Sequence, residues 1–142
     1  MTDLHEPGVS HPATRANAPV WIGRVLSGLF VLFMLGASIA PKLLGMPVAA
    51  ATLEQLGWRG DHAPAIGLLE LTLVILYVIP RTRVLGAILF MGLLGGAMAT
   101  QIRADMPLFS HVLFSLYLGL IMWGGLWLRD PGLRALFPLR RA

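Results

Sequence analysis

The sequence contains no cysteine and few charged residues. Only 13% of its 142 residues are charged, which is roughly half the share usual for a soluble domain. The absence of cysteine excludes disulfides, thiol nucleophiles and thiolate metal sites from this sequence. Because 56% of the residues are hydrophobic, too little polar material is present to cover a water-facing surface. The composition therefore excludes a soluble enzyme, a disordered tail and a fibrous repeat.

Four long apolar runs account for the excess of hydrophobic residues. They cover 20–40, 65–79, 84–102 and 108–128, and each is bounded by proline or charge. A helix of about 20 residues crosses the hydrocarbon core of a bilayer. The second run is shorter than this, so we expect its helix to be little tilted or to thin the bilayer locally. A signal peptide ending at 38–40 is the alternative for the first run. Its length and the following Pro41 favour a retained helix.

The segments outside these runs complete the predicted architecture. Residues 1–18 are polar and contain two prolines, which predicts a flexible cytoplasmic tail. Residues 48–56 have helical character and precede Trp58, a residue type that is enriched at membrane interfaces. Residues 131–142 form a basic amphipathic tail. The predicted fold is all-α, a four-transmembrane-helix bundle over 19–130 with a short interfacial helix between spans 1 and 2.

Basic residues are distributed unevenly between the two ends of the predicted bundle. With both termini inside, eight of the eleven Lys and Arg residues lie on the inner side, and Lys42, Arg59 and Arg103 lie outside. This asymmetry satisfies the positive-inside rule. It predicts a multi-pass protein of the bacterial cytoplasmic (inner) membrane, N-in and C-in. The same topology explains the net charge of +4, so we expect the lipid bilayer as a partner and no nucleic acid.

Polar side chains gather in the outer half of the predicted spans. Glu70 lies about 9 Å below the outer surface, where burial of a charge costs several kcal/mol. The candidate ligand-binding residues share this depth or a helical face with it, and they are Lys42, Glu70, Tyr77, Gln101, Arg103, His111 and Ser115. No catalytic residue is assigned among them, and no histidine has the spacing of a metal ligand.

Helical spacing groups these residues on shared faces. Glu70 and Tyr77 are seven residues apart, and His111 and Ser115 are four apart, so each pair shares one face of its helix. These faces predict an outward-opening polar pocket with a cation opposite Glu70. We expect Arg103 to be that cation, with Lys42 as the alternative.

A stripe of small residues lines one face of the third predicted span, which also carries Arg103. Gly92, Gly96, Ala99 and Arg103 follow one another at spacings of four, three and four, which keeps them on one face. Small residues at such spacing let helices approach closely. We therefore expect this face, with Arg103, to pack into the bundle.

Distinctive segments between Gly67 and Pro138 carry a family resemblance. They are the helix around Glu70, YVIPRTR at 77–83, the stretch 95–103, PLF at 107–109 and WGGLWLRD at 123–130. In these segments the chain resembles the DoxX-like family of small four-helix integral membrane proteins. Many relatives carry a histidine where this chain has Gln101. The proton-transfer or ligand role that a histidine could have at that position therefore does not carry over to this chain.

The resemblance implies a membrane protein of one of two functional classes. The family's name comes from a subunit associated with thiosulfate:quinone oxidoreduction, and other relatives are linked to membrane redox complexes. A eukaryotic branch is linked to receptor assembly. The resemblance alone does not choose between these classes.

Two functional hypotheses follow, with a third that the sequence favours less. In the first, a quinone-like or other small apolar ligand enters laterally. His111, Gln101 or Arg103 meets its carbonyl, and Glu70 exchanges protons. The sequence supplies no redox group of its own, so the expected cofactor is a bound quinone or lipid, and electrons would come from a redox-complex partner.

In the second hypothesis the protein is a non-catalytic assembly factor or anchor for a membrane-protein partner. Its polar cluster is then a structural ion pair, and His111 and Lys42 lie at the interface without a catalytic role. The third, a transporter or channel, requires a homo-oligomer to enclose a pore. Whether the protein is an enzyme stays open at this point.

Overall fold

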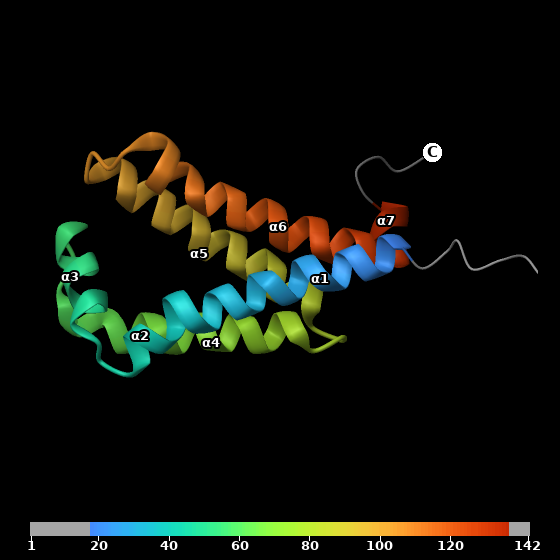
Figure 1. Ribbon diagram of the computed structural model, residues 1–142, viewed down its shortest axis with the longest axis horizontal. Coiled ribbons are helices and arrows are strands. Elements are labelled where there is room, and N and C mark those ends of the chain that lie inside the picture. The colour runs from blue at the N-terminus through green and yellow to red at the C-terminus, as the bar shows by residue number, and fades with distance from the viewer. Residues whose placement is uncertain (1–17, 137–142) are drawn as a thin grey trace, which may run out of the picture.

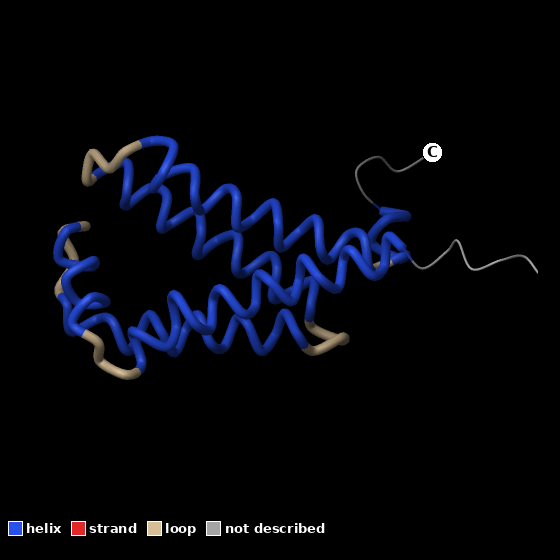
Figure 2. Tube along the Cα trace, in the orientation of Figure 1, coloured by secondary structure: helices blue, strands red, loops and turns tan. Residues whose placement is uncertain are grey.

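The computed structural model describes residues 18–136, which are almost entirely helical (Figure 1). The elements are α1 (Ala18–Phe33), the π-helical turn η1 (Met34–Ile39), α2 (Ala40–Leu43), α3 (Pro47–Gln55), the 3₁₀ turn η2 (Gly60–His62), α4 (Ala63–Val78), α5 (Arg83–Arg103), the π-helical turn η3 (Leu108–Val112), α6 (Leu113–Arg129) and α7 (Pro131–Leu136). Short loops join them (Figure 2). The all-α prediction is confirmed. Residues 1–17 of the predicted N-terminal tail and 137–142 of the predicted C-terminal tail lie outside the described residues.

Four helical segments are long and apolar enough to cross a membrane. They are Ala18–Leu43, Gly60–Val78, Arg83–Arg103 and Leu108–Arg129. The second has 19 residues, which makes it longer than the predicted run 65–79 but still the shortest of the four. Pro64 does not bound the helix but lies in its first turn, where the missing N–H needs no helical partner. The turn η2 then extends the segment outward.

The four spans form two arms that are joined at one end (Figure 1). Helix α1 packs along α6, and α4 packs along α5. Near α7 all four spans lie close together, whereas near α3 the pair α5 and α6 diverges from α2 and α4 (Figure 1). We call these the α7 end and the α3 end. We call η1, α2 and the start of α4 the first arm, and the end of α5, η3 and the start of α6 the second arm.

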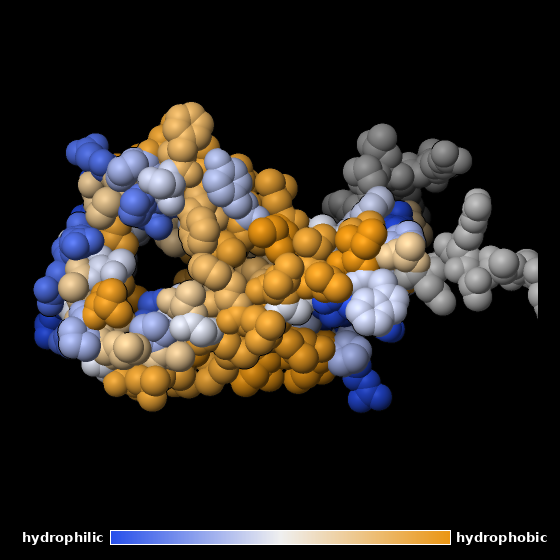
Figure 3. Space-filling view, in the orientation of Figure 1, coloured by the Kyte–Doolittle hydropathy of each residue, from blue (hydrophilic) through white to orange (hydrophobic). Residues whose placement is uncertain are grey.

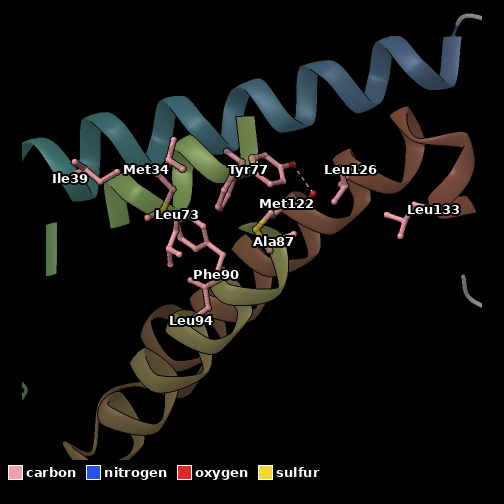
Figure 4. Close-up of a cluster of buried hydrophobic side chains, with 12 residues drawn as sticks. Met34, Ile39, Leu73, Tyr77, Ala87, Phe90, Leu94, Met122, Leu126 and Leu133 are labelled. Carbon is pink, nitrogen blue, oxygen red and sulfur yellow. Dashed lines mark hydrogen bonds between the residues drawn. The ribbon is translucent and has the colours of Figure 1, made fainter. Parts of the chain in front are cut away.

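Buried side chains repeat at spacings of three and four along each span. Helix α5 buries Ala87, Phe90 and Leu94, which is the interval expected when one face of a helix lines a core. The core also holds Phe30, whose ring packs edge-to-face against Tyr77 and Phe90. Tyr77, Ala87 and Phe90 lie where the two arms meet (Figure 4). The core therefore fixes the α7 side of the bundle.

Close backbone contacts occur at glycines other than those of the predicted stripe. A Cβ atom on Gly86 would lie 2.5 Å from the backbone nitrogen of Tyr77, and one on Gly23 would lie 2.7 Å from the carbonyl oxygen of Gly125. In the described chain, nothing lies within 4 Å of a Cβ built on Gly92 or Gly96. The prediction that this stripe packs into the bundle is therefore wrong. Gly92 and Gly96 lie about 200° around α5 from the buried Phe90 and Leu94, so they face outward.

The short helix α3 confirms the predicted interfacial helix between the first two spans. It lies across the α3 end of the first arm (Figure 1), and its first residue, Pro47, supplies a suitable φ angle. It buries Ala49 and Leu53 against Ala63. This packing fixes α3 over the start of α4.

Candidate polar site at the α3 end

A π-helical turn places the polar side chains of the first span. Pro41 has no N–H group, and a proline ring inside a helix clashes with the carbonyl four residues before it. The turn η1 relieves this clash, because the N–H of Ala40 donates to the carbonyl of Leu35 five residues back. The wider turn brings Ser38 and Lys42, four residues apart, toward α4. Single π-turns of this kind are frequent at functional sites.

Lys42, Glu70 and Ser38 form a compact charged cluster. The Lys42 Nζ atom donates to both carboxylate oxygens of Glu70 at 2.9 Å and to the Ser38 hydroxyl at 2.6 Å. Ser38 Oγ in turn donates to Glu70, at 3.0 Å from Oε2. The side chains of Lys42 and Glu70 are only 16% and 9% exposed. Both charges are therefore largely buried and paired with each other, which is the condition for placing them in a membrane.

The partner of Glu70 is thus Lys42, and the expectation of Arg103 is wrong. Arg103 is exposed at the end of α5, and its Nη2 atom donates to the carbonyl oxygen of Leu56 at 2.8 Å. The guanidinium also lies against Gly57, whose φ of +77° suits glycine. Arg103 therefore ties the tip of the second arm to the segment after α3, across the outer edge of the space between the arms.

Gln101 lies on the inward face of α5. It lies seven residues, or about two helical turns, after the buried Leu94 and therefore on the same face of α5. This face also carries Ala87 and Phe90. The Gln101 side chain is half-buried, and its Oε1 atom is buried with no hydrogen-bond partner among residues 18–136. Ser115 on α6 is also buried. The second arm thus brings polar groups to the inside of the bundle from both of its helices.

His111 does not join these residues. The turn η3 is π-helical, with the N–H of Val112 directed to the carbonyl of Pro107 five residues back. This extra residue rotates His111 away from the face of Ser115, and Val112 is buried in its place. His111 is exposed and contacts Ser110, with 2.8 Å between Ser110 Oγ and His111 Nδ1. The predicted shared face of His111 and Ser115 is therefore wrong.

Tyr77 also lies away from the Glu70 cluster, although the two share a face of α4. The seven intervening residues correspond to about 10 Å along the helix. Tyr77 is fully buried, and its hydroxyl donates to the carbonyl oxygen of Met122 at 2.9 Å (Figure 4). Ser27 then serves as the donor of its 2.9 Å hydrogen bond to the Tyr77 hydroxyl. Tyr77 is thus a link between α1, α4 and α6 rather than part of the outer polar group.

An opening separates the two arms near the α3 end (Figure 3). Apolar surface flanks it on the side toward the middle of the bundle, and more polar surface lies toward α3 (Figure 3). An edge-to-face contact of Phe33 with Phe114 joins the arms part-way along. The Arg103 bond to Leu56 joins them again at the tip. The opening between the arms therefore lies between the Phe33–Phe114 contact and the hydrogen bond of Arg103 to Leu56.

A shallow cavity of about 380 Å³ borders the same cluster at the α3 end. Its lining includes Lys42, Glu54 and Asp61. Lys42 thus lies between the buried carboxylate of Glu70 and an accessible cavity that two acidic side chains also line. In the described part of the chain, no group of three His, Asp or Glu side chains has the geometry of a metal site.

A comparison with protein-family models identifies the family of the chain. The model of the DoxX-like family matches residues 25–125, which includes all four spans in whole or in large part. The chain belongs to the DoxX-like family. This DoxX-like protein is an integral membrane protein, as its four apolar helices also indicate. No curated protein and no solved structure matches the chain.

One member of the polar site of this DoxX-like protein was not among the candidate residues. Ser38 bridges Lys42 and Glu70, yet a serine near the end of an apolar run carries no signal by itself. Its spacing of four from Lys42, with Pro41 between them, is the pattern that could have identified it. A polar pair just before and after a helical proline indicates a local turn that presents both side chains together.

Proposed function

We propose that this DoxX-like protein binds a small quinone-like molecule between its two arms at the α3 end. The observation that carries the proposal is Gln101, whose buried Oε1 lacks a partner among the described residues while its helix faces the space between the arms. An unpartnered buried amide oxygen costs free energy. A ligand hydroxyl, such as that of a quinol, would satisfy it, and the amide N–H would serve a quinone carbonyl.

The shape of the molecule supports a ligand that arrives from the bilayer. The opening lies within the spanning segments and has apolar surface on one side (Figure 3). Ligand pockets are largely apolar with a few convergent polar groups. A flat ring with carbonyl groups and an apolar tail suits that combination, since the ring would lie between the arms and the tail would remain among the lipid chains.

The charged cluster supplies the polar chemistry on the first arm. Lys42 Nζ has three N–H donors and already contacts Ser38 and both carboxylate oxygens of Glu70, so one N–H would turn from an acceptor that another donor also serves to reach a ligand carbonyl. The Glu70 carboxylate can accept a proton from a quinol and becomes neutral. The ammonium group of Lys42 would then stabilise the quinol anion that the transfer leaves. The residues of the chain bind and orient the ligand and exchange protons. Electrons would come from a redox partner in the membrane.

A second candidate function is a non-catalytic assembly factor or anchor. The completeness of the Lys42–Glu70–Ser38 cluster favours it, because every carboxylate oxygen of Glu70 has a partner without any ligand. Such a network can fix the register of two helices. In this case the outward-facing glycines Gly92 and Gly96 would be available to a partner helix.

Quinone binding to the Gln101→Leu variant separates these functions. We expect a short-chain benzoquinone to bind saturably to the full chain in phosphatidylcholine nanodiscs, followed by quenching of tryptophan fluorescence. Removal of one hydrogen bond to the ligand should weaken binding about five- to tenfold. The matched control is Gln55→Leu, which changes the only other glutamine, an exposed residue at the end of α3. Gln55→Leu should bind like the unmodified protein.

Two results would count against ligand binding. One is the absence of saturable quenching in the unmodified protein, and the other is equal binding by both glutamine variants. Either result would leave the assembly role as the better account. A melting temperature unchanged by Gln101→Leu shows that any loss of binding does not come from unfolding.

We further propose that the α7 end faces the cytoplasm of a bacterial cell, with the protein in the inner membrane. Among residues 18–136 the α7 end carries Arg24, Arg81, Arg83, Arg129 and Arg134, whereas the α3 end carries Lys42, Arg59 and Arg103. The positive-inside rule then sets the orientation. A reporter fused after Ala142 should report the cytoplasm, and one inserted beside Gly60 should report the outer side. The reverse pattern would overturn this orientation.

A further inference from the structure

A second cavity lies at the α7 end, away from the polar site described above. It has a volume of about 360 Å³ and is lined by residues of α1, α4 and α6, namely Arg24, Ser27, Gly28, Val31, Leu32, Tyr77, Val78 and Arg129. Two arginines are thus combined with an apolar lining. The hydroxyl of Tyr77 is already engaged with Ser27 and Met122, so the arginines are the groups available to a ligand.

The arginine of α6 is held against Tyr77, and two of its guanidinium nitrogens lack acceptors among residues 18–136. The Arg129 guanidinium carbon lies 5.1 Å from the centre of the Tyr77 ring, a cation–π contact. Its Nε and Nη2 atoms are buried and have no hydrogen-bond partner in the described chain. Buried donors without acceptors are unfavourable, and charged ones especially so. An anion in the cavity would satisfy them.

No carboxylate of residues 18–136 fills this role. The neighbouring Asp130 pairs with Arg83 at 2.8 Å and also accepts from the backbone N–H groups of Gly132 and Leu133. Arg24 and Arg129 make no ion pair within those residues. The cavity therefore has a net positive charge that its own lining does not balance.

The apolar part of the cavity runs from Arg24 along α1. Gly28, Val31 and Leu32 follow Arg24 at four, seven and eight residues, so they share its side of the helix. Nothing described lies within 4 Å of a Cβ atom built on Gly28, which leaves a shallow channel at that residue. Val78 of α4 lines the same cavity. The channel leads from the charged end toward the middle of the spans.

We propose that this cavity binds one anionic phospholipid. Its phosphate would be held between Arg24 and Arg129, and one acyl chain would lie along Gly28, Val31 and Leu32. Basic pockets between spanning helices on the cytoplasmic side suit acidic headgroups, and guanidinium groups bind phosphate oxygens in a bidentate manner. The lipid would join α1 to α6 at the end of the bundle where both arms meet.

Lipid titration of the full chain tests this proposal. The protein is purified in a neutral detergent and titrated with phosphatidylglycerol or with phosphatidylcholine of the same acyl chains, and the melting temperature and the retained lipid are measured by thermal scan and native mass spectrometry. We expect phosphatidylglycerol alone to raise the melting temperature and to remain bound as one molecule. Arg24→Gln should weaken its binding about fivefold or more.

Three further variants make the result specific. Arg129→Gln should act like Arg24→Gln, and Gly28→Leu should weaken lipid binding by filling the channel. The matched control is Arg81→Gln, which removes one exposed charge at the same end, outside the cavity. Arg24 is itself exposed, so its variant should fold even if Arg129→Gln does not.

Each contrary outcome is distinct. Equal effects of Arg24→Gln and Arg81→Gln would show a general charge effect and overturn the site. Both lipids carry a phosphate, and only phosphatidylglycerol has a net negative charge, so equal stabilisation by the two would overturn the preference for an anionic phospholipid. Stabilisation by glycerol 3-phosphate to the same degree would identify a free-anion site, which overturns the lipid.

Discussion

Glu70→Gln is expected to destabilise the bundle by about 3 kcal/mol, because it leaves the ammonium group of Lys42 without a counter-charge. Both side chains are largely buried, and the carboxylate contacts Lys42 and Ser38 through both of its oxygens. A glutamine retains the shape and one acceptor but loses the charge. Thermal unfolding of the full chain in mild detergent measures the effect. Glu54→Gln, which changes an exposed acid near the same end, should shift the melting temperature by less than a fifth as much.

The double variant Glu70→Gln with Lys42→Met tests whether the two charges interact directly. Removal of both charges should recover part of the loss, since a buried pair replaced by neutral side chains of similar size is often tolerated. The combined loss should therefore be smaller than the sum of the two single losses. Combining Glu70→Gln with Arg103→Gln should give a simple sum, because Arg103 bonds to Leu56 and not to Glu70. A strictly additive result for the Lys42 pair would show that the two charges do not interact.

The spans themselves were predictable from the sequence because they depend on hydropathy and length. The predicted runs agree with the observed helices within a few residues, except near Pro64. There the sequence pattern predicts a boundary at Pro64, which instead occupies the first turn of α4. Proline is favourable in the first turn of a helix, whereas in the interior it breaks or kinks the helix.

The composition of the polar site was less predictable because it depends on helix rotation. Extrapolation at 3.6 residues per turn places His111 beside Ser115, and this fails at η3, where one extra residue enters the turn. The same kind of turn at η1 brings Ser38 and Lys42 to Glu70. A π-turn cannot be read from hydropathy. Only Pro41 indicated that the first span departs from a regular helix.

Gly86→Ala is expected to destabilise the bundle by about 2–3 kcal/mol, because α4 and α5 meet there backbone to backbone. A Cβ atom on Gly86 would lie 2.5 Å from the nitrogen of Tyr77 and 2.7 Å from the carbonyl carbon of Leu76. Both are main-chain atoms, so no side-chain rotation relieves the clash and the helices must separate. This displacement also disturbs Tyr77, whose hydroxyl links α4 to α1 and α6.

Gly96→Ala on the same helix is the matched control, and it should have the opposite sign. Within the described residues no atom lies within 4 Å of its Cβ position, so the added methyl group meets no clash. Alanine in a helix interior is favoured over glycine by up to about 1 kcal/mol. Thermal unfolding of both variants in detergent should therefore show a marked loss for Gly86→Ala and a small gain for Gly96→Ala. A loss at Gly96 comparable to that at Gly86 would show that the outward stripe is itself a helix contact. Because α5 directs that face away from its own bundle, the contacting helix would then have to come from another molecule.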